Sequence, residues 1–149
     1  MTAAPELLLD TGIVLHATRQ GSQVSAALDQ QFGLSASRFR PAICEVSIGE
    51  LLAFALGWGE RRKALLQAQI GKTLVIPISH PGVHERFAEV SAAMRSAGKP
   101  VGHNDMWIAA TALVTGFTVL TVDGDFLDLR DCCDVRVIVV DNRTGARTA

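Results

Sequence analysis

Four acidic residues, far apart in the sequence, occupy positions where side chains commonly do chemistry. Asp10 directly follows an early apolar run, and Asp123 follows a later one. Asp105 lies in the first turn of an expected helix, and Glu50 lies about two turns into another. If the apolar runs are parallel strands, their carboxyl ends meet at the edge of the sheet where ligands bind. We therefore expect three of these acids to meet at that edge, and Glu50 to lie on a helix leading away from it.

Carboxylates held close together repel one another, and burial adds to the cost of their charge. A bound divalent cation removes that penalty, and ligands that are all oxygen suit Mg²⁺ or Mn²⁺ better than zinc. Such sites activate water and stabilise the phosphoryl transition state of nucleic-acid cleavage. A simpler interpretation stays open for each Asp, because an Asp at a strand end or helix start is often a cap. Glu50 lies in an apolar stretch, where a lone carboxylate is costly unless it is exposed or paired.

Short apolar runs alternate with longer helical patterns along the chain. The runs are too continuously apolar for a sheet with one solvated face, so they favour parallel strands between two layers of helices. We therefore predict an α/β fold with a sheet of about five parallel strands and helices on both faces. The strands are expected at residues 7–9, 39–43, 73–76, 117–121 and 135–140, and the helices at 13–19, 22–32, 45–56, 60–70, 81–97 and 104–115. Asn104 is the expected N-cap of the last of these helices, and a short helix is expected near Phe126.

The chain has 149 residues, of which 48% are hydrophobic and 19% charged. These values predict one domain over residues 1–149 and exclude extended disorder, with the tail from about residue 142 a candidate for disorder. The longest apolar runs are far shorter than the roughly 20 residues of a membrane span. The first residues lack the positive charge of a signal peptide. The three cysteines form no disulfide framework, so we expect a cytoplasmic location and no membrane partner.

The formal net charge of -1 gives no sign of a nucleic-acid partner, but it is a sum of unequal parts. Residues 1–18 carry two acids and no base, residues 19–99 carry ten bases and six acids, and residues 100–149 carry four bases and seven acids. The three net charges are therefore -2, +4 and -3. Setting aside the four acids above changes the total from -1 to +3, since -1 plus 4 is +3. The acids therefore mask an excess of basic residues.

The segments around these acids resemble the motifs of PIN domains, and most of all those of VapC-type toxin ribonucleases. The four segments are LLLDTGIVL at 7–15, SIGEL at 47–51, NDMWIAATA at 104–112 and LTVDGDF at 120–126. Gly12 departs from the family pattern, which commonly has Asn or Ser there. The acid of the second motif corresponds to Glu50 rather than Glu45, and that of the fourth to Asp123 rather than Asp125.

The resemblance implies a single PIN-like nuclease domain that acts as a metal-dependent endoribonuclease on RNA, with Mg²⁺ or Mn²⁺ as its cofactor. Asp10 and Asp105 would be the principal metal ligands, and Glu50 and Asp123 would complete the acidic pocket. Water would attack the phosphodiester in line, leaving a 5′-phosphate and a 3′-hydroxyl.

Three further residues are weaker candidates for this site. Thr11 and Thr121 would hydrogen-bond water or phosphate, or would simply satisfy backbone groups at strand ends. Asp125 would be an outer residue of the site or a cap of the short helix near Phe126.

The resemblance also implies a homodimer, and a cognate VapB-like antitoxin whose C-terminal segment lies over the active-site groove. The helices at 53–69 carry Phe54 and Trp58, which would supply an apolar surface for such a partner or belong to the core. The basic run at 61–63 is either a solvated helix face or a surface that steers phosphate.

A different class of function stays open, because some PIN-like domains are RNA-binding or regulatory modules with little catalysis of their own. All four acids of the pattern are present here, which favours catalysis. His80 and His84 have the spacing of metal ligands on a helix, but no third ligand is evident. His103 immediately precedes the third motif and is a further candidate for contact with substrate.

Overall fold

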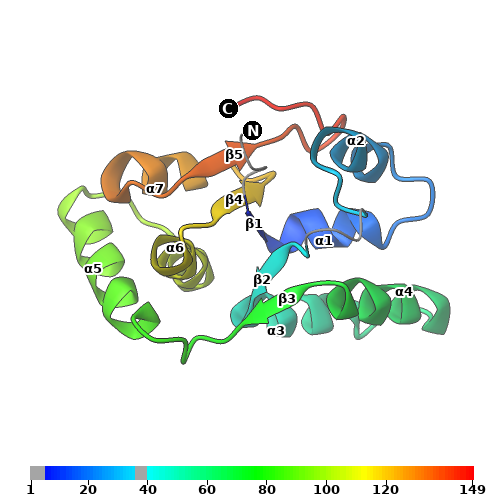
Figure 1. Ribbon diagram of the computed structural model, residues 1–149, viewed down its shortest axis with the longest axis horizontal. Helices are drawn as coiled ribbons and strands as arrows, with labels where there is room; N and C mark the ends of the chain where they lie inside the picture. Colours follow the sequence, from blue (N-terminus) through cyan, green and yellow to red (C-terminus); the bar gives the residue numbers. More distant parts are fainter. Residues whose placement is uncertain (1–5, 36–39) are drawn as a thin grey trace.

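The computed structural model describes residues 6–35 and 40–149, and its centre is a five-stranded sheet (Figure 1). The strands lie in the order β3-β2-β1-β4-β5, and each pairs in parallel with its neighbours. Their bounds are β1 Leu7–Leu9, β2 Ala42–Cys44, β3 Leu74–Ile76, β4 Thr118–Thr121 and β5 Val137–Val139. The predicted α/β class and the parallel sheet are confirmed. Phe39, placed in the second expected strand, lies outside the described residues.

Helices follow the strands on both sides of the sheet. They are α1 Thr11–Ala17, α2 Gln23–Phe32, α3 Glu45–Ala55, α4 Glu60–Gly71, α5 Val83–Ser96, α6 His103–Thr115 and α7 Phe126–Cys133. Each expected helix is present with small shifts at its ends. Asn104 is not the N-cap of α6, because that helix begins one residue earlier and Gly102 is its N-cap, with an extended backbone and no side-chain cap bond.

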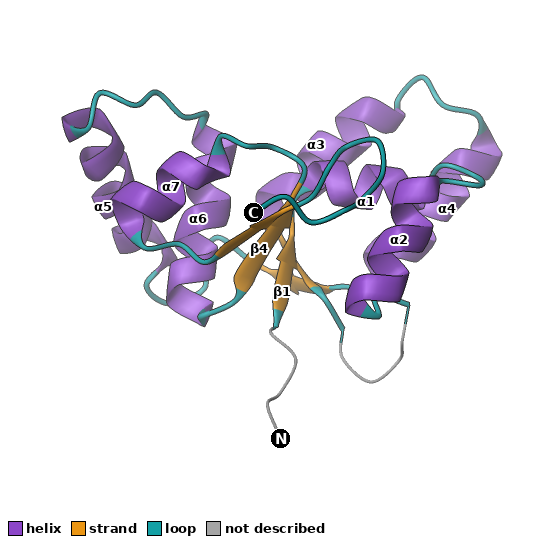
Figure 2. Ribbon diagram, turned by 90° about the horizontal axis from the view of Figure 1, so that it is seen from above, coloured by secondary structure: helices purple, strands orange, loops and turns teal. Residues whose placement is uncertain are grey.

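Four of the five strands divide their side chains between two apolar cores, one on each face of the sheet, whereas only Ile76 of the edge strand β3 is buried. Leu8 and Val119 belong to a core covered by α5, α6 and α7, whereas Leu9 and Leu120 belong to a core covered by α1 to α4. Figure 2 shows these two groups of helices on opposite sides of the strands. Burial of consecutive residues on both faces explains why these four strands lack the alternation of apolar and polar residues that a sheet with one solvated face shows.

The strand order reverses direction between β1 and β4. The chain moves outward from β1 through β2 to β3, then returns to place β4 on the other side of β1. Such a reversal separates the connections that leave the two central strands and opens a crevice at their carboxyl ends. Asp10 and Asp123 follow these two strands, so the topology brings both acids to one crevice.

The C-terminal tail folds back along the sheet edge. Val140 forms an antiparallel bridge with Arg147, and the side chain of Asn142 contacts His16 Nε2 at 2.8 Å from Oδ1. Gly145 has a φ of 75° and is buried against α2, where a Cβ atom would lie 3.0 Å from that of Ala27. The residues from 142 onward, considered above as a candidate for disorder, therefore have defined contacts in this structure. Among the described residues, no helix is both long enough and apolar enough to cross a membrane.

Candidate active site

Asp10 joins the end of β1 to the start of α1. It is the N-cap of α1, and its Oδ1 accepts a hydrogen bond of 2.8 Å from the backbone N–H of Thr11. Its backbone N–H donates to the carbonyl of Leu120 on β4, and only 8% of the residue is exposed. The capping interpretation of Asp10 is therefore correct as far as its position goes, but a cap needs only one of its two carboxylate oxygens.

The second oxygen of Asp10 is held by Thr121, at the end of β4. Thr121 Oγ1 donates a hydrogen bond of 2.7 Å to Asp10 Oδ2. Thr121 Oγ1 also accepts a hydrogen bond of 2.9 Å from the backbone N–H of Asp123. Thr121 has no exposed surface. One hydroxyl thus links the acid after β1 to the acid after β4, and fixes their relative positions.

Glu50 is held by the residue that follows Asp10. Thr11 Oγ1 donates a hydrogen bond of 3.0 Å to Glu50 Oε1 across the contact between α1 and α3. Glu50 is half-buried and Thr11 is buried. The two threonines predicted to contact water or phosphate thus each contact a carboxylate of the acid set.

The pKa of Asp105 is raised by its burial and by the other acids of the set. Burial raises its pKa from the ordinary 3.8 to about 7, helped by the charges of Asp10, Asp123 and Glu50, in decreasing order, and then that of Asp125. Desolvation disfavours the ionised form, and each nearby negative charge disfavours it further. The structure therefore brings the four predicted acids together from four separate segments of the chain.

Asp10 shows the same effect against opposing hydrogen bonds. Burial is the largest cause and raises its pKa, while the bonds from Thr121 and from the Thr11 backbone lower it. The charges of Glu50 and Asp123 raise it again, and the net direction is upward. Two hydrogen bonds to the carboxylate do not offset its burial beside other acids.

Asp123 and Asp125, the two candidates for the fourth acid, differ in their surroundings. Asp123 is half-buried, and its Oδ1 accepts a hydrogen bond of 2.9 Å from the backbone N–H of Asp125. Asp125 is exposed and stands at the N-cap position of α7, but its side chain makes no cap bond. Asp123 also acts on both Asp10 and Asp105 by charge, and Asp125 is the last contributor at Asp105 alone.

The donor chemistry of this acid set fits a hard divalent cation. All the side-chain donors are oxygen atoms, and a cation would relieve the repulsion that raises the pKa of Asp105. Within residues 6–35 and 40–149, no group of three or more His, Cys, Asp or Glu side chains is placed so that it could hold a metal ion as it stands. Mg²⁺ does not require one, because it usually keeps several waters and takes one or two carboxylates from the protein.

One contact beside the acids could not be read from the sequence. A Cβ atom on Gly12 would lie 2.9 Å from Val122 Cγ2, so the side chain of Val122 fills the space that a residue other than glycine would need. The departure from the family pattern at Gly12 thus has a steric partner in the segment after β4. A single sequence gives no signal of this pairing.

The remaining sequence candidates lie outside the acid set. Phe54 is 56% exposed and is not a core residue, whereas Trp58 is half-buried beneath Arg62, whose guanidinium carbon lies 3.6 Å from the centroid of the indole ring. His84 packs edge-on against Trp107, with 5.9 Å between ring centroids. Within the part of the chain that the structure describes, His84 belongs to no group of three residues that could bind zinc.

Comparison with known proteins identifies the family. The PIN domain family model matches residues 7–131. The chain is 30% identical over 119 residues to Ribonuclease VapC4 of Mycobacterium tuberculosis, covering 72% of this chain and 89% of that protein. It is 27% identical over 133 residues to Ribonuclease VapC5 of the same organism, covering 89% and 94%.

The fold agrees with a solved structure of the same kind. The crystal structure of VapBC-5 from Mycobacterium tuberculosis, a member of the VapBC family of toxin-antitoxin systems, superimposes with a TM-score of 0.68. The sequences are 25% identical, and the match covers 91% of this chain and 100% of the other. The family-model match covers most of the chain, so the chain belongs to the PIN domain family, as a relative of the VapC ribonucleases.

Proposed function

We propose that this protein is a metal-dependent endoribonuclease and the toxin of a VapBC-type toxin–antitoxin pair. The observation that carries the proposal is the convergence of acids from separate segments, in which Thr121 joins Asp10 to Asp123 by hydrogen bonds and Thr11 holds Glu50. Burial and the charges of these three acids and of Asp125 raise the pKa of Asp105 to about 7. Proteins keep mutually repelling carboxylates close together at sites where a bound cation compensates for the repulsion. The relatives named as VapC ribonucleases support RNA as the substrate.

Asp10 and Asp105 would hold Mg²⁺, or Mn²⁺ in its place, and Glu50 and Asp123 would complete the site. When bound, the cation supplies Lewis-acid activation of water and neutralises charge on the phosphate. The protein needs no side-chain nucleophile in this scheme.

The threonines position the acids in this scheme. Thr121 fixes Asp10 Oδ2 and Thr11 fixes Glu50 Oε1, so neither carboxylate can rotate freely. Each carboxylate oxygen has two lone-pair sites, so Asp10 can still bind a cation while it accepts these bonds. Glu50 Oε2 is not used by the bond from Thr11, and it would accept a proton from the attacking water.

The partner we propose is a VapB-like antitoxin bound to the apolar surface of α3 and α4. Leu52 and Phe54 on α3 are 44% and 56% exposed, Leu56 at its C-cap is 81% exposed, and Leu65 on α4 is 39% exposed. Large exposed apolar side chains such as these are typical of a protein interface. A homodimer, expected from the family, is part of the proposal, as is a cytoplasmic location, which fits three free thiols.

The deciding experiment is cleavage of a defined RNA by the purified protein with Mg²⁺, with Mn²⁺ and with EDTA. We expect cleavage with either cation and none with EDTA. Asp10→Asn should abolish cleavage and keep the circular dichroism spectrum, whereas Asp131→Asn, on the exposed face of α7, should cleave normally. RNA binding without cleavage under every metal condition would favour the RNA-binding or regulatory alternative, and full cleavage in EDTA would contradict the metal site.

A further inference from the structure

A surface cavity lies at the junction of α5 and α6, and none of the four acids lines it. It is open to solvent, has a volume of about 360 Å³ and is lined by the last turns of α5, the loop that follows and the first turn of α6. Met94 and Met106 line it and are themselves buried. Its polar side chains are Ser91, Arg95, Lys99 and His103. A volume of this size is in the range of small-ligand pockets.

The charge of this cavity is opposite to that of the acid site. Arg95, Lys99 and His103 are all exposed, and no carboxylate is among the described residues that line the cavity. Arg95 has no ion-pair partner within the described part of the chain. Its guanidinium is therefore available to an anion, and its planar fork suits phosphate oxygens.

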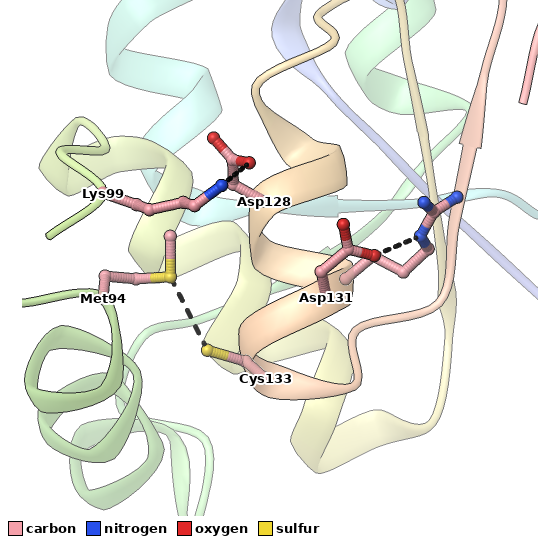
Figure 3. Close-up of polar contacts among 6 residues, drawn as sticks. Met94, Lys99, Asp128, Asp131 and Cys133 are labelled. Carbon is pink, nitrogen blue, oxygen red and sulfur yellow. Dashed lines mark hydrogen bonds and ion pairs between the residues drawn. The ribbon is translucent and has the colours of Figure 1, made fainter. Parts of the chain in front are cut away.

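Lys99 is already held in place. Its Nζ lies 3.2 Å from Asp128 Oδ1, and Figure 3 shows the lysine side chain reaching from its loop to α7. The ion pair fixes the lysine but neutralises part of its charge. Arg95 is thus the stronger of the two permanent cations of the cavity.

The imidazole of His103 is also fixed by its neighbours. It packs edge-on against Phe87, with ring centroids 6.3 Å apart, and Phe87 stacks on Trp107 at 3.9 Å. The ring is thus supported from α5 by Phe87, which itself stacks on Trp107 of α6. A supported donor loses less conformational entropy when it binds a ligand.

The cavity and the acid site share the first turn of α6. His103 and Met106 line the cavity, and Asp105 stands between them in the sequence but belongs to the acid site. The two sites are therefore separated by roughly the width of a helix, about 10 Å. A nucleic-acid strand with one phosphate at the acids would need to span only a few nucleotides to reach the cavity.

We propose that this cavity binds a phosphate group of the RNA strand, beside the phosphodiester that the acid site cleaves. The proposal rests on the proposed ribonuclease function. Arg95 would make the principal contact, and His103 and Ser91 would donate further hydrogen bonds. The phosphate is either an internal one or the terminal 5′-phosphate, and both present the same oxygens.

The test compares Arg95→Gln with Arg86→Gln, a matched change on the same helix. Arg86 is exposed, is paired with Glu89 and is not part of the cavity. The Kd for a labelled RNA is measured in EDTA over a series of salt concentrations, and KM and kcat for its cleavage are measured in Mg²⁺. The RNA is used with a 5′-phosphate and with a 5′-hydroxyl.

We expect Arg95→Gln to raise Kd and KM about tenfold, to change kcat little, and to lower the slope of log Kd against log salt by about 0.7, the value for one phosphate contact on a single strand. The Arg86→Gln protein should resemble the wild type. An equal effect on both RNAs assigns an internal phosphate, and an effect only on the phosphorylated RNA assigns the terminal one. If the wild type cleaves RNA and Arg95→Gln has the same Kd, salt slope and KM as the wild type, this site alone is overturned. A wild type that neither binds nor cleaves RNA would overturn the proposed function.

Discussion

The hydroxyl of Thr121 lies 2.7 Å from Asp10 Oδ2 and donates a hydrogen bond to it. The same hydroxyl accepts from the backbone N–H of Asp123, so its single hydrogen is committed to Asp10. The bond lowers the pKa of Asp10 against the larger effect of burial. Thr121 thereby keeps a buried carboxylate closer to the ionised form that a cation needs.

Thr121→Val should therefore weaken the binding of the metal at the acid site and leave the fold intact. The change keeps the shape of the side chain but leaves Asp10 Oδ2 without its donor, so the pKa of Asp10 should rise further. We expect the Mg²⁺ concentration for half-maximal cleavage to rise about 10-fold or more, since loss of a residue that orients a metal ligand typically costs 10- to 100-fold. Thr118→Val, on the same strand, serves as the control. Identical Mg²⁺ dependence in both variants and the wild type would contradict this role.

The raised pKa of Asp105 predicts how stability depends on pH without metal. The folded protein holds the proton of Asp105 up to about pH 7, whereas the unfolded chain releases it near 3.8, so folding favours the protonated form. This group's contribution is therefore most favourable below pH 3.8 and is lost as the pH rises toward 7. In EDTA, Asp105→Asn should melt higher than the wild type at pH 8, and the difference should shrink toward pH 5.

Two controls make this pH prediction specific. Asp125→Asn removes an exposed acid that contributes least to the pKa of Asp105, so its melting temperature should follow the wild type. Mg²⁺ at pH 8 should stabilise the wild type more than Asp105→Asn, because only the wild type has the complete acid set. Asp105→Asn should also fail to cleave RNA. A melting temperature of Asp105→Asn below that of the wild type at pH 8 would indicate a structural cap instead.

The fold was predictable because local patterns and global packing agree. Leu7, Leu8 and Leu9 are consecutive apolar residues, which indicates burial on both faces, and the structure divides them between the two cores. Asn104 is a better cap by residue type than Gly102, yet α6 begins so that Gly102 takes the cap position. A cap preference of about 1 kcal/mol is too small to set a helix start against tertiary packing.

The acid site was predictable only in part. Acids at the ends of apolar runs must converge in a parallel sheet, so Asp10 and Asp123 follow from the pattern. The bond from Thr11 to Glu50 depends on how α1 packs against α3, which no periodicity reports. The exposure of Phe54 likewise depends on packing, because Phe54 and the half-buried Trp58 have the same apolar character in the sequence.

Ser47 offers a test of stability that is separate from the chemistry. Its hydroxyl is fully buried on α3 and has no hydrogen-bond partner among the described residues. A buried polar group without a partner costs about 1–3 kcal/mol, so Ser47→Ala should raise the free energy of unfolding by about 1 kcal/mol. Thr111→Val, which removes a bond of 2.8 Å to the carbonyl of Trp107, should lower it instead. Urea unfolding distinguishes the two, and a loss of stability in Ser47→Ala would mean that its hydroxyl has a partner after all.

Gly12 and Val122 should behave as a coupled pair. A Cβ atom on Gly12 would lie 2.9 Å from Val122 Cγ2, closer than such atoms normally approach. Val122 is β-branched and stiff at χ1, so it cannot easily rotate away. Gly12→Ala should therefore cost about 1–3 kcal/mol of stability, as overpacking does. It should also reduce cleavage, because the neighbouring residues Asp10 and Thr11 would shift with the backbone.

A double-mutant cycle of Gly12→Ala and Val122→Ala separates this steric cost from the effect of losing a flexible glycine. Val122→Ala alone should cost some stability by removing packing, but in its presence Gly12→Ala should cost little, because the clashing methyl group is gone. Gly12 is in α1, where alanine is intrinsically preferred to glycine by about 1 kcal/mol. The double variant should then match or exceed Val122→Ala in urea unfolding. If the costs of the two single changes simply add, the two residues do not compete for the same space, and the departure from the family pattern at Gly12 has another cause.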